Sequence, residues 1–481
     1  MKISRIALIF FILGFTQCNI PSLNKSELQG LTEIQTLLRL IDSLNNDSNI
    51  PNSNLAISYA ESSYSFLTGE EISEIVPETQ GSPTEFSISP QLVSGLNFDS
   101  ATGAISGTPN KVITNQIYTI TASKLSETQS ATISITTRIP SACSDTTIVL
   151  GSGTSIDPFQ ICSPDQLQSL TAHHIANPNS FYELQQDLDL SSIANFDPIG
   201  TSVNPFNGVF NGNYHTIFNL KIDYPAISSV GLFGETSGGL TTIIQNLRLR
   251  NAWVRGLSRV GNLIGNSAAN QVENIISYDG YSRSESDAAG GLIGRNSGVA
   301  VIYNSGFTGT VEVVTNYAGG ILGYAFGSDQ MKKCFANATV SGGDYIGGLI
   351  GRQVSIFIED SYAQGSVTGA TYVGGLSGRS SFGAASITNS YSAVVVSPGV
   401  IQGGLVSEIS AAVNNSYYDS DITTQADNDT RGQPRTTNQL KCPTEPNDSC
   451  AGIVIFDTWD PTIWNFGDGT TYPSLQWEKD F

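Results

Sequence analysis

Short apolar stretches punctuated by glycine recur at nearly constant spacing along the second half of the chain. The first copy, Val230–Gly234, reads Val-Gly-Leu-Phe-Gly, and later copies read Gly-Gly-Leu-Ile-Gly, as at Gly290–Gly294. The last residues of the seven copies are separated by 31, 29, 29, 28, 27 and 29 residues. They are Gly234, Gly265, Gly294, Gly323, Gly351, Gly378 and Ser407. A fixed period of this length is typical of repeat architectures.

A second signal follows each later copy after 9 to 12 residues, where a small residue stands beside an aromatic one. Its instances are Ser305 with Phe307, Cys334-Phe335, Ser361-Tyr362, Ser390-Tyr391 and Ser416-Tyr417. Alternation typical of strands often comes next, as in Gly365–Gly369. Strands this short bury a face only by stacking on their neighbours, so the pattern predicts a β-solenoid of about eight coils.

The glycine phrase followed by Asn-Ser-Tyr resembles the GLUG repeat of bacterial surface and secreted proteins. The resemblance covers the chain from Asp157 onward, with Asp187–Leu190 and Phe206–Gly212 similar to first coils and Tyr472–Trp477 to a closing segment. It implies the solenoid architecture and no particular reaction. Both ends need caps, because bare strand edges invite polymerisation. A short helix at Gln166–Thr171 is expected at one end, and an apolar plug holding Trp459, Trp464 and Trp477 at the other.

The stretch 55–140 has a different texture, with alternating strands separated by turn glycines. Phe86–Pro90, Asn97–Pro109 and Ile117–Ala122 resemble the immunoglobulin-like, cadherin-related module of bacterial surface proteins. The resemblance implies a β-sandwich with Phe98 and Ile105 pointing inward. Relatives of cadherin bind calcium through clustered carboxylates. The candidates here are Glu70, Glu71 and Asp99, and ordinary surface carboxylates are the favoured alternative.

The N-terminus reads as a targeting segment. Lys2 and Arg5 precede the apolar run Ile6–Phe15, which is too short to span a bilayer, and Cys18 follows at once. The position of Cys18 resembles a lipoprotein lipobox and implies acylation at that residue. An ordinary signal peptide with an incidental cysteine is the alternative.

The resulting division of the chain has six parts. They are a lipoprotein signal peptide (1–18), a partly helical tether (19–54), an immunoglobulin-like sandwich (55–140), a linker and N-terminal cap (141–205), the solenoid (206–420) and a C-terminal cap (421–481). The predicted fold class is all-β.

Charge and composition narrow the partners. A net charge of −20 disfavours nucleic acid and anionic lipid headgroups, because both are bound through Lys and Arg. Three histidines and no Cys-x-x-Cys spacing leave little for a metal or general-base site. No cofactor is therefore expected, apart from the weak calcium hypothesis.

The cysteines beyond Cys18 predict two short disulfide loops and one free thiol. The economical pairs are Cys143 with Cys162 and Cys442 with Cys450, near the two ends of the solenoid. Cys334 occupies the position of Ser305 in a neighbouring repeat and is expected as a buried free thiol.

Aligning the repeats gives three columns of side chains. Asp287, Asn316, Asp344 and Thr371 form one column. Tight turns explain it better than catalysis by paired carboxylates, which need to be close together. A second column holds Tyr317, Tyr345 and Tyr372, and a third holds Arg295, Arg352 and Arg379 with Tyr324 in the remaining coil. These two are interpreted either as ladders that stabilise the solenoid or as a stripe that binds a glycan or an acidic protein loop.

Together these features predict a lipid-anchored, surface-exposed protein of the bacterial outer membrane. The favoured role is a non-enzymatic adhesin or structural module that binds a host protein or glycan. A β-helix enzyme acting on polysaccharide is the alternative. No catalytic residue is assigned.

Overall fold

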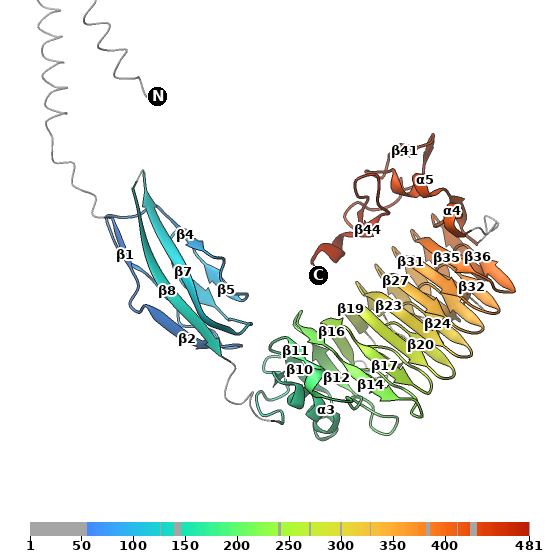
Figure 1. Ribbon diagram of the computed structural model, residues 1–481, viewed down its shortest axis with the longest axis horizontal. Helices are drawn as coiled ribbons and strands as arrows, with labels where there is room; N and C mark the ends of the chain where they lie inside the picture. The colour runs from blue at the N-terminus through green and yellow to red at the C-terminus, as the bar shows by residue number, and fades with distance from the viewer. Residues whose placement is uncertain are drawn as a thin grey trace, which may run out of the picture.

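The computed structural model describes residues 55–480 except 126, 139–145, 239–241, 269–270, 299–300, 328, 381–384, 411 and 424–430. It contains an N-terminal sandwich and a β-solenoid of about eight turns (Figure 1). The predicted fold class is confirmed. The predicted signal peptide, the predicted acylation site Cys18 and the predicted tether lie outside the described residues.

The sandwich is built from one four-stranded sheet and two small two-stranded sheets. The larger sheet has the order β2 (Ser63–Leu67), β8 (Glu127–Arg138), β7 (Ile113–Lys124) and β4 (Glu85–Ser89). The small sheets pair β1 (Ala56–Ser58) with β3 (Glu78–Gln80), and β5 (Leu96–Phe98) with β6 (Ile105–Gly107). Alternation on β7 buries Tyr118, Ile120 and Ala122, and Ile105 packs with them in one core. The period of two thus places one face of each sheet inside.

Each regular coil of the solenoid contributes four short strands, which stack in parallel columns. The first column is β20 (Ala288–Gly290), β24 (Tyr317–Gly319), β28 (Tyr345–Gly347), β32 (Tyr372–Gly374) and β36 (Ile401–Gly403). The second is β15 (Phe233–Glu235), β18 (Ile264–Ser267), β21 (Ile293–Asn296), β25 (Leu322–Ala325), β29 (Ile350–Gln353), β33 (Ser377–Ser380) and β37 (Val406–Ile409).

The other two columns belong to one continuous parallel sheet. The third column runs through β12 (Gly208–Asn211), β16 (Ile243–Arg250), β19 (Gln271–Ser284), β22 (Val301–Tyr303), β26 (Gln330–Lys332), β30 (Phe357–Glu359), β34 (Ser386–Thr388) and β38 (Ala412–Asn414). The fourth runs through β13 (Thr216–Phe218), the later parts of β16 and β19, β23 (Gly306–Val313), β27 (Phe335–Ser341), β31 (Tyr362–Thr368), β35 (Tyr391–Ser397) and β39 (Tyr417–Asp419). Early coils add β14 (Lys221–Tyr224) and β17 (Trp253–Gly256).

The glycine phrase forms the corner between the first two columns. Its apolar pair, Leu349 and Ile350 in one coil, is fully buried, and the equivalent residues of other coils stack on it. The glycines do not adopt the left-handed backbone there. They are needed because coils approach closely: a Cβ on Gly348 would lie 2.2 Å from the carbonyl oxygen of Gly375.

The Asn-Ser-Tyr signal forms the corner between the third and fourth columns. The residue before the small one has positive φ in each coil, as at Asn304 and Asn389, a conformation that asparagine tolerates well. The next side chain points inward, and each serine hydroxyl accepts a backbone N–H from the coil before it, as Ser390 does from Ser361 at 3.1 Å. The aromatic residue that directly follows points outward in the later coils, as Phe335, Tyr362, Tyr391 and Tyr417 do. The coil with Ser305 differs, because Gly306 takes that position and Phe307 packs in the solenoid core. The motif therefore satisfies a buried turn and stacks a ring on each of these later coils.

The N-terminal cap is longer than predicted. Helix α3 spans Pro164–Ala176, beginning after the N-cap Ser163, whose hydroxyl accepts the Gln166 N–H. Leu167 and Leu170 are fully buried against the first coils. Strands β9 (Phe159–Ile161), β10 (Ser180–Leu184) and β11 (Leu188–Asp189) and the 3-10 turn Leu190–Ser192 lead into the solenoid.

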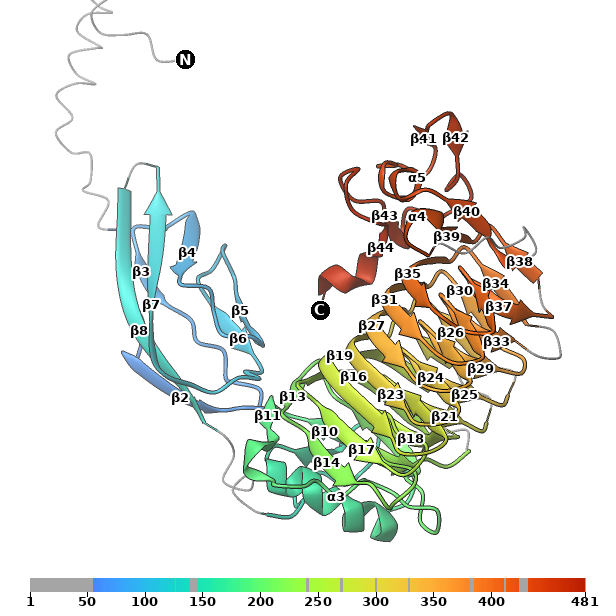
Figure 2. The ribbon, with the colours of Figure 1, turned by 45° about the vertical axis from the view of Figure 1, so that its right-hand side comes forward.

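The C-terminal segment does not form the predicted end plug. After α4 (Ser420–Thr423), β40 (Gln433–Arg435) adds a strand to β39, and α5 (Thr437–Lys441) follows. The segment then turns back along the side of the rod (Figure 2), so that Trp477 Nε1 donates to the Lys333 carbonyl oxygen at 2.9 Å. Its small elements are β41 (Ser449–Cys450), β42 (Ile453–Val454), β43 (Trp464–Asn465), β44 (Ser474–Leu475) and the 3-10 turn Gln476–Asp480.

Candidate functional site

The predicted tyrosine and arginine columns are two neighbouring rows on the solenoid surface. Tyr317, Tyr345 and Tyr372 pair directly at the start of β24, β28 and β32. Across the glycine corner the second row holds the remaining members of what we term the Tyr-Arg stripe. In order along the rod they are Arg295, Tyr324, Arg352 and Arg379.

The rings and guanidinium groups of the stripe interleave. The ring centroids of Tyr345 and Tyr372 are 5.0 Å apart and their planes are within 3° of parallel. The Arg352 guanidinium lies 5.1 Å from the Tyr345 ring, and its Nη1 donates to the Tyr317 hydroxyl at 3.3 Å. Arg379 lies 4.6 Å from the Tyr372 ring. These distances are those of cation–π contacts, so each coil reinforces the next.

The stripe offers hydrogen-bond donors rather than open ring faces. All seven of its side chains are half-buried, and the faces of the inner rings are covered by neighbouring rings and guanidinium groups. Burial raises the pKa of Tyr324, so its hydroxyl stays protonated at neutral pH. Arg379 also pairs with Glu408 at 2.8 Å. What faces outward is a row of phenol and guanidinium edges that repeats at the coil spacing of about 4.8 Å.

A second aromatic ladder, on the fourth column, is covered. Phe335, Tyr362 and Tyr391 stack with centroid separations of 5.4 and 5.1 Å. Trp464 and Trp477 of the C-terminal segment pack on it. We call these rings the covered ladder. The same rod thus carries one aromatic ladder sealed by its own chain and one that no other described segment covers.

The carboxylate column is occupied by bonds between coils. Asn316 Nδ2 donates to Asp287 Oδ1 at 2.9 Å, and Thr371 Oγ1 donates to Asp344 Oδ1 at 2.7 Å. Asp287 and Asp344 stand on alternate coils and are not brought together. The turn interpretation of this column therefore agrees with the geometry.

The calcium candidates do not converge. Asp99 Oδ1 accepts the Ala101 N–H at 2.8 Å, and this bond lowers the pKa of the exposed carboxyl. Glu70 and Glu71 follow β2 in the turn at Thr68–Gly69. Within the part of the chain that the structure describes, no group of three or more His, Cys, Asp or Glu residues is placed to hold a metal ion.

The cysteines fall into three situations. Cys442 and Cys450 are joined by a disulfide with their Cα atoms 6.2 Å apart. Cys162 is buried and disulfide-bonded, and Cys143 lies outside the described residues. Cys334 is a free, fully buried thiol, and burial raises its pKa to about 12.

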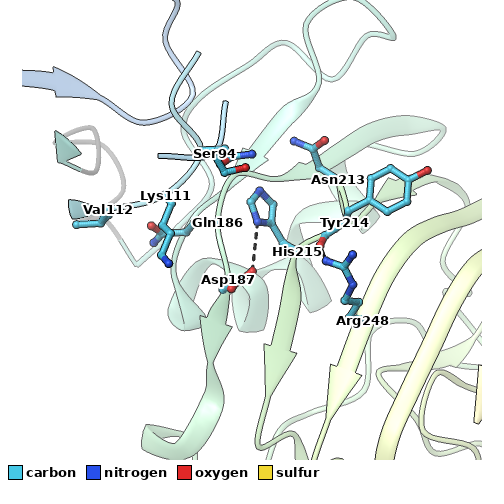
Figure 3. A pocket seen from close by; sticks show the side chains of 10 residues that line it. Ser94, Lys111, Val112, Gln186, Asp187, Asn213, Tyr214, His215 and Arg248 are labelled. Atoms are coloured by element: carbon cyan, nitrogen blue, oxygen red, sulfur yellow. Dashed lines mark hydrogen bonds and ion pairs between the residues drawn. The ribbon is translucent and has the colours of Figure 1, made fainter. Parts of the chain in front are cut away.

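A cavity that the sequence did not indicate lies between the sandwich and the first coils (Figure 3). It has a volume of about 510 Å³. Ser94, Asn110, Lys111 and Val112 line it from the sandwich, and Gln186, Asp187, Asn213, Tyr214, His215 and Arg248 from the solenoid. His215 Nδ1 lies 3.3 Å from Asp187 Oδ1, and this hydrogen bond is the main reason that the pKa of Asp187 is lowered.

The repeat period of the sequence could have predicted part of the lining of this cavity. Asp187 and His215 are 28 residues apart, which is one coil, so the repeat period predicts that they are neighbours. The period stops short of the sandwich residues, whose position depends on how the two domains meet.

Comparisons with known proteins agree with the sandwich. Residues 49–138 match the family described as "Putative Ig domain". The first domain is immunoglobulin-like. Among the described residues, no helix is both long and apolar enough to cross a membrane.

Two further proteins are similar to this chain. "Halomucin" from Haloquadratum walsbyi (strain DSM 16790 / HBSQ001) is 33% identical over 175 residues, covering 33% of this chain. The chain spans about 2% of the length of that relative. A crystal structure described as a putative immunoglobulin A1 protease from Bacteroides ovatus is 23% identical, with a TM-score of 0.42. That match covers 68% of this chain and 94% of the other.

Proposed function

We propose that the protein is a non-enzymatic surface module that binds an extended glycan along its Tyr-Arg stripe. The observation that carries the proposal is the difference between the two aromatic ladders. The chain seals the ladder at Tyr362 and Tyr391 with its own tryptophans and leaves the rings at Tyr345 and Tyr372 at the surface. Stacking alone explains both ladders, but not why only one stays uncovered.

The chemistry of the stripe favours a glycan with acidic groups. Phenol hydroxyls and guanidinium N–H groups donate hydrogen bonds, and hydroxyl and carboxylate oxygens accept them. A row that repeats once per coil, about every 4.8 Å, suits a polymer that presents such groups at regular intervals. The local cations Arg295 and Arg352 also contrast with the net charge of −20, which repels other acidic polymers elsewhere on the protein.

The cellular setting is part of the same proposal. Lys2, Arg5 and the apolar run before Cys18 favour export and acylation, and the tether would hold the rod away from the outer membrane. The immunoglobulin-like match and the resemblance of the coils to GLUG repeats support a role at the bacterial surface. Cleavage of the intact protein by a protease added to whole cells tests the exposure. Protection of the rod in intact cells would contradict it.

A glycan array with the whole chain tests the binding, read beside a variant in which Tyr317, Tyr345 and Tyr372 are all serine. Loss of acidic-glycan binding is expected, because the row of hydroxyl and guanidinium donors is broken. Phe357→Ser is the matched control, since Phe357 is an exposed aromatic residue on the third column. Binding that survives the triple substitution would reject the stripe.

The same purified protein distinguishes a binding module from the alternative, an enzyme that acts on polysaccharide. Release of reducing sugar from polysaccharides that bind the array would favour an enzyme. Retention of uncleaved glycan is expected for a binding module. Binding of a host protein in place of any glycan would redirect the proposal to an adhesin for protein.

A further inference from the structure

The cavity between the two domains has the size and lining of a small-molecule site. Its volume of about 510 Å³ falls in the usual range for ligand pockets. Both domains contribute residues to its lining, and the boundary between two domains is a common place for ligand sites. The stripe lies on later coils, so this cavity is independent of the function proposed above.

His215 gives the cavity an unsatisfied polar atom. Its side chain is 8% exposed, and Nδ1 is held by Asp187. Asp187 Oδ1 also accepts a hydrogen bond from the Thr216 N–H at 2.9 Å. This bond holds the carboxylate in place as the hydrogen-bond acceptor for Nδ1 of the imidazole. Nδ1 therefore carries the proton in the neutral ring, and Nε2 is an acceptor. Figure 3 shows the ring with one nitrogen toward Asp187 and the other toward the side from which Ser94 enters.

Nε2 of His215 has no hydrogen-bond partner although it is buried. Leaving a buried polar atom unsatisfied costs about 1–3 kcal/mol, so a ligand hydroxyl that donates to Nε2 would recover this free energy. The atom thus points to a ligand with a hydroxyl group.

The charges around the cavity point to a carboxylate on the same ligand. Lys111 enters from the sandwich and Arg248 from β16 of the solenoid, on a chain whose net charge is −20. The one carboxylate in the lining, Asp187, is engaged by His215 and Thr216. Asn110, Asn213 and Ser94 add polar groups, and the exposed Val112 and Tyr214 offer apolar surface for a ring.

We propose that this cavity binds a single sugar acid of the hexuronate class across the domain boundary. A ring hydroxyl donates to His215 Nε2, and the carboxylate lies between Lys111 and Arg248. Because the ligand contacts both domains, its binding also holds the sandwich against the first coils. No bond is made or broken.

Calorimetry with the whole chain and galacturonate tests the site, with galactose and acetate as separate probes. Galacturonate is expected to bind at least tenfold more tightly than either, since galactose lacks the charge and acetate lacks the hydroxyls. If galactose bound with the same affinity as galacturonate, the role of the cations would be overturned. If acetate bound with the same affinity as galacturonate, the role of Nε2 would be overturned. Absence of galacturonate binding would overturn the proposal.

Variants locate the contact. Lys111→Ala changes an exposed side chain of the sandwich and is expected to weaken galacturonate binding at least tenfold. His215→Asn keeps an amide near the Nδ1 position that can contact Asp187, but it removes the acceptor at the Nε2 position. It is also expected to weaken galacturonate binding at least tenfold. His215→Gln places an amide near the Nε2 position and restores part of the affinity.

Two controls separate this site from other effects. Lys221→Ala removes an exposed cation outside the cavity and is expected to leave the affinity unchanged. The triple tyrosine variant of the stripe should also bind galacturonate normally, so failure of one proposal does not decide the other. Equal losses in Lys221→Ala and Lys111→Ala would show that net charge alone is responsible and would contradict the cavity site.

Discussion

The hydroxyl of Tyr362 donates to the Glu478 carboxylate at 2.9 Å, although 116 residues separate the two in sequence. Tyr362 belongs to the covered ladder on β31, and Glu478 belongs to the last turn of the C-terminal segment. The carboxylate also accepts the Leu475 N–H. This contact joins the end of the described chain to the middle of the rod.

Docking of the C-terminal segment is expected to weaken as the pH rises. Burial raises the pKa of Glu478 from 4.5 to about 7, against the smaller opposing effect of its hydrogen bonds. Between these values the folded protein keeps a proton that the unfolded chain releases, so stability is fullest below pH 4.5 and falls as pH rises through 7. The loss is at most about 3 kcal/mol.

Glu478→Gln keeps both acceptor contacts without the charge, so its stability should not show this component. The measurement is denaturant unfolding of both proteins at pH 5 and pH 8, with hydrogen exchange in the C-terminal segment. The wild type should lose stability relative to the variant by up to about 3 kcal/mol over this range. Parallel pH profiles for the two proteins would show that Glu478 carries no such effect.

Trp464→Ala is expected to release the C-terminal segment while the coils stay folded. The Trp464 ring is 1% exposed, and its Nε1 donates to Asp360 Oδ1 at 3.3 Å. Removing a buried tryptophan costs about 3–5 kcal/mol, and this loss falls on the contact between the segment and the coils. Limited proteolysis should cut residues 457–480 first. Trp253→Ala, in an early coil, should leave the segment protected, and simultaneous unfolding of the coils in Trp464→Ala would contradict this view.

Gly348→Ala is expected to destabilise the rod by about 1–3 kcal/mol, because the added methyl meets a rigid neighbour. The new Cβ would lie 2.2 Å from the Gly375 carbonyl oxygen and 2.6 Å from the Ala363 Cβ. Gly238→Ala is the matched control, since its nearest neighbour would be 3.6 Å away. Chemical unfolding compares the two. A neutral Gly348→Ala would mean that the coils separate easily at this corner.

The Cys334 thiol is expected to resist alkylation in the folded protein at pH 8. Burial raises its pKa to about 12, so very little thiolate is present, and the side chain is fully buried. Iodoacetamide followed by peptide mapping should label Cys334 only after unfolding. Labelling of Cys442 and Cys450 should require reduction of their disulfide in addition to unfolding. Cys334→Ser should fold normally, since serine occupies the same position in neighbouring coils; labelling of native Cys334 would contradict its placement.

The coil architecture could be predicted because each coil repeats the same contacts with the next one. The spacing that separates Tyr317, Tyr345 and Tyr372 in sequence is the spacing of one coil, so aligned residues become neighbours. The reason for the glycines was less visible. Close approach of Gly348 to Gly375 depends on the distance between coils, and a single repeat does not reveal it.

The position of the C-terminal segment and the cavity could not be predicted, because the contacts that form them do not follow the repeat period. The concentration of tryptophan near the end indicated an apolar surface, but an end plug and a side cover have the same composition. Contacts far back along the rod distinguish them, such as the hydrogen bond from Trp477 to the Lys333 carbonyl oxygen. In the same way, the repeat period relates Asp187 to His215, whereas Lys111 comes from another domain. Helix α3 also extends beyond Thr171, to Ala176, and buries His174 in this added part.

The backward course of the C-terminal segment orders the assembly of the rod. A ribosome releases these residues after all the coils they touch, and their binding surface exists only when Phe335, Tyr362 and Tyr391 are already aligned. A misregistered coil would break that alignment and leave the segment without a place to dock. The segment therefore docks only on a correctly stacked rod, and a molecule with a misregistered coil keeps these aromatic rings uncovered.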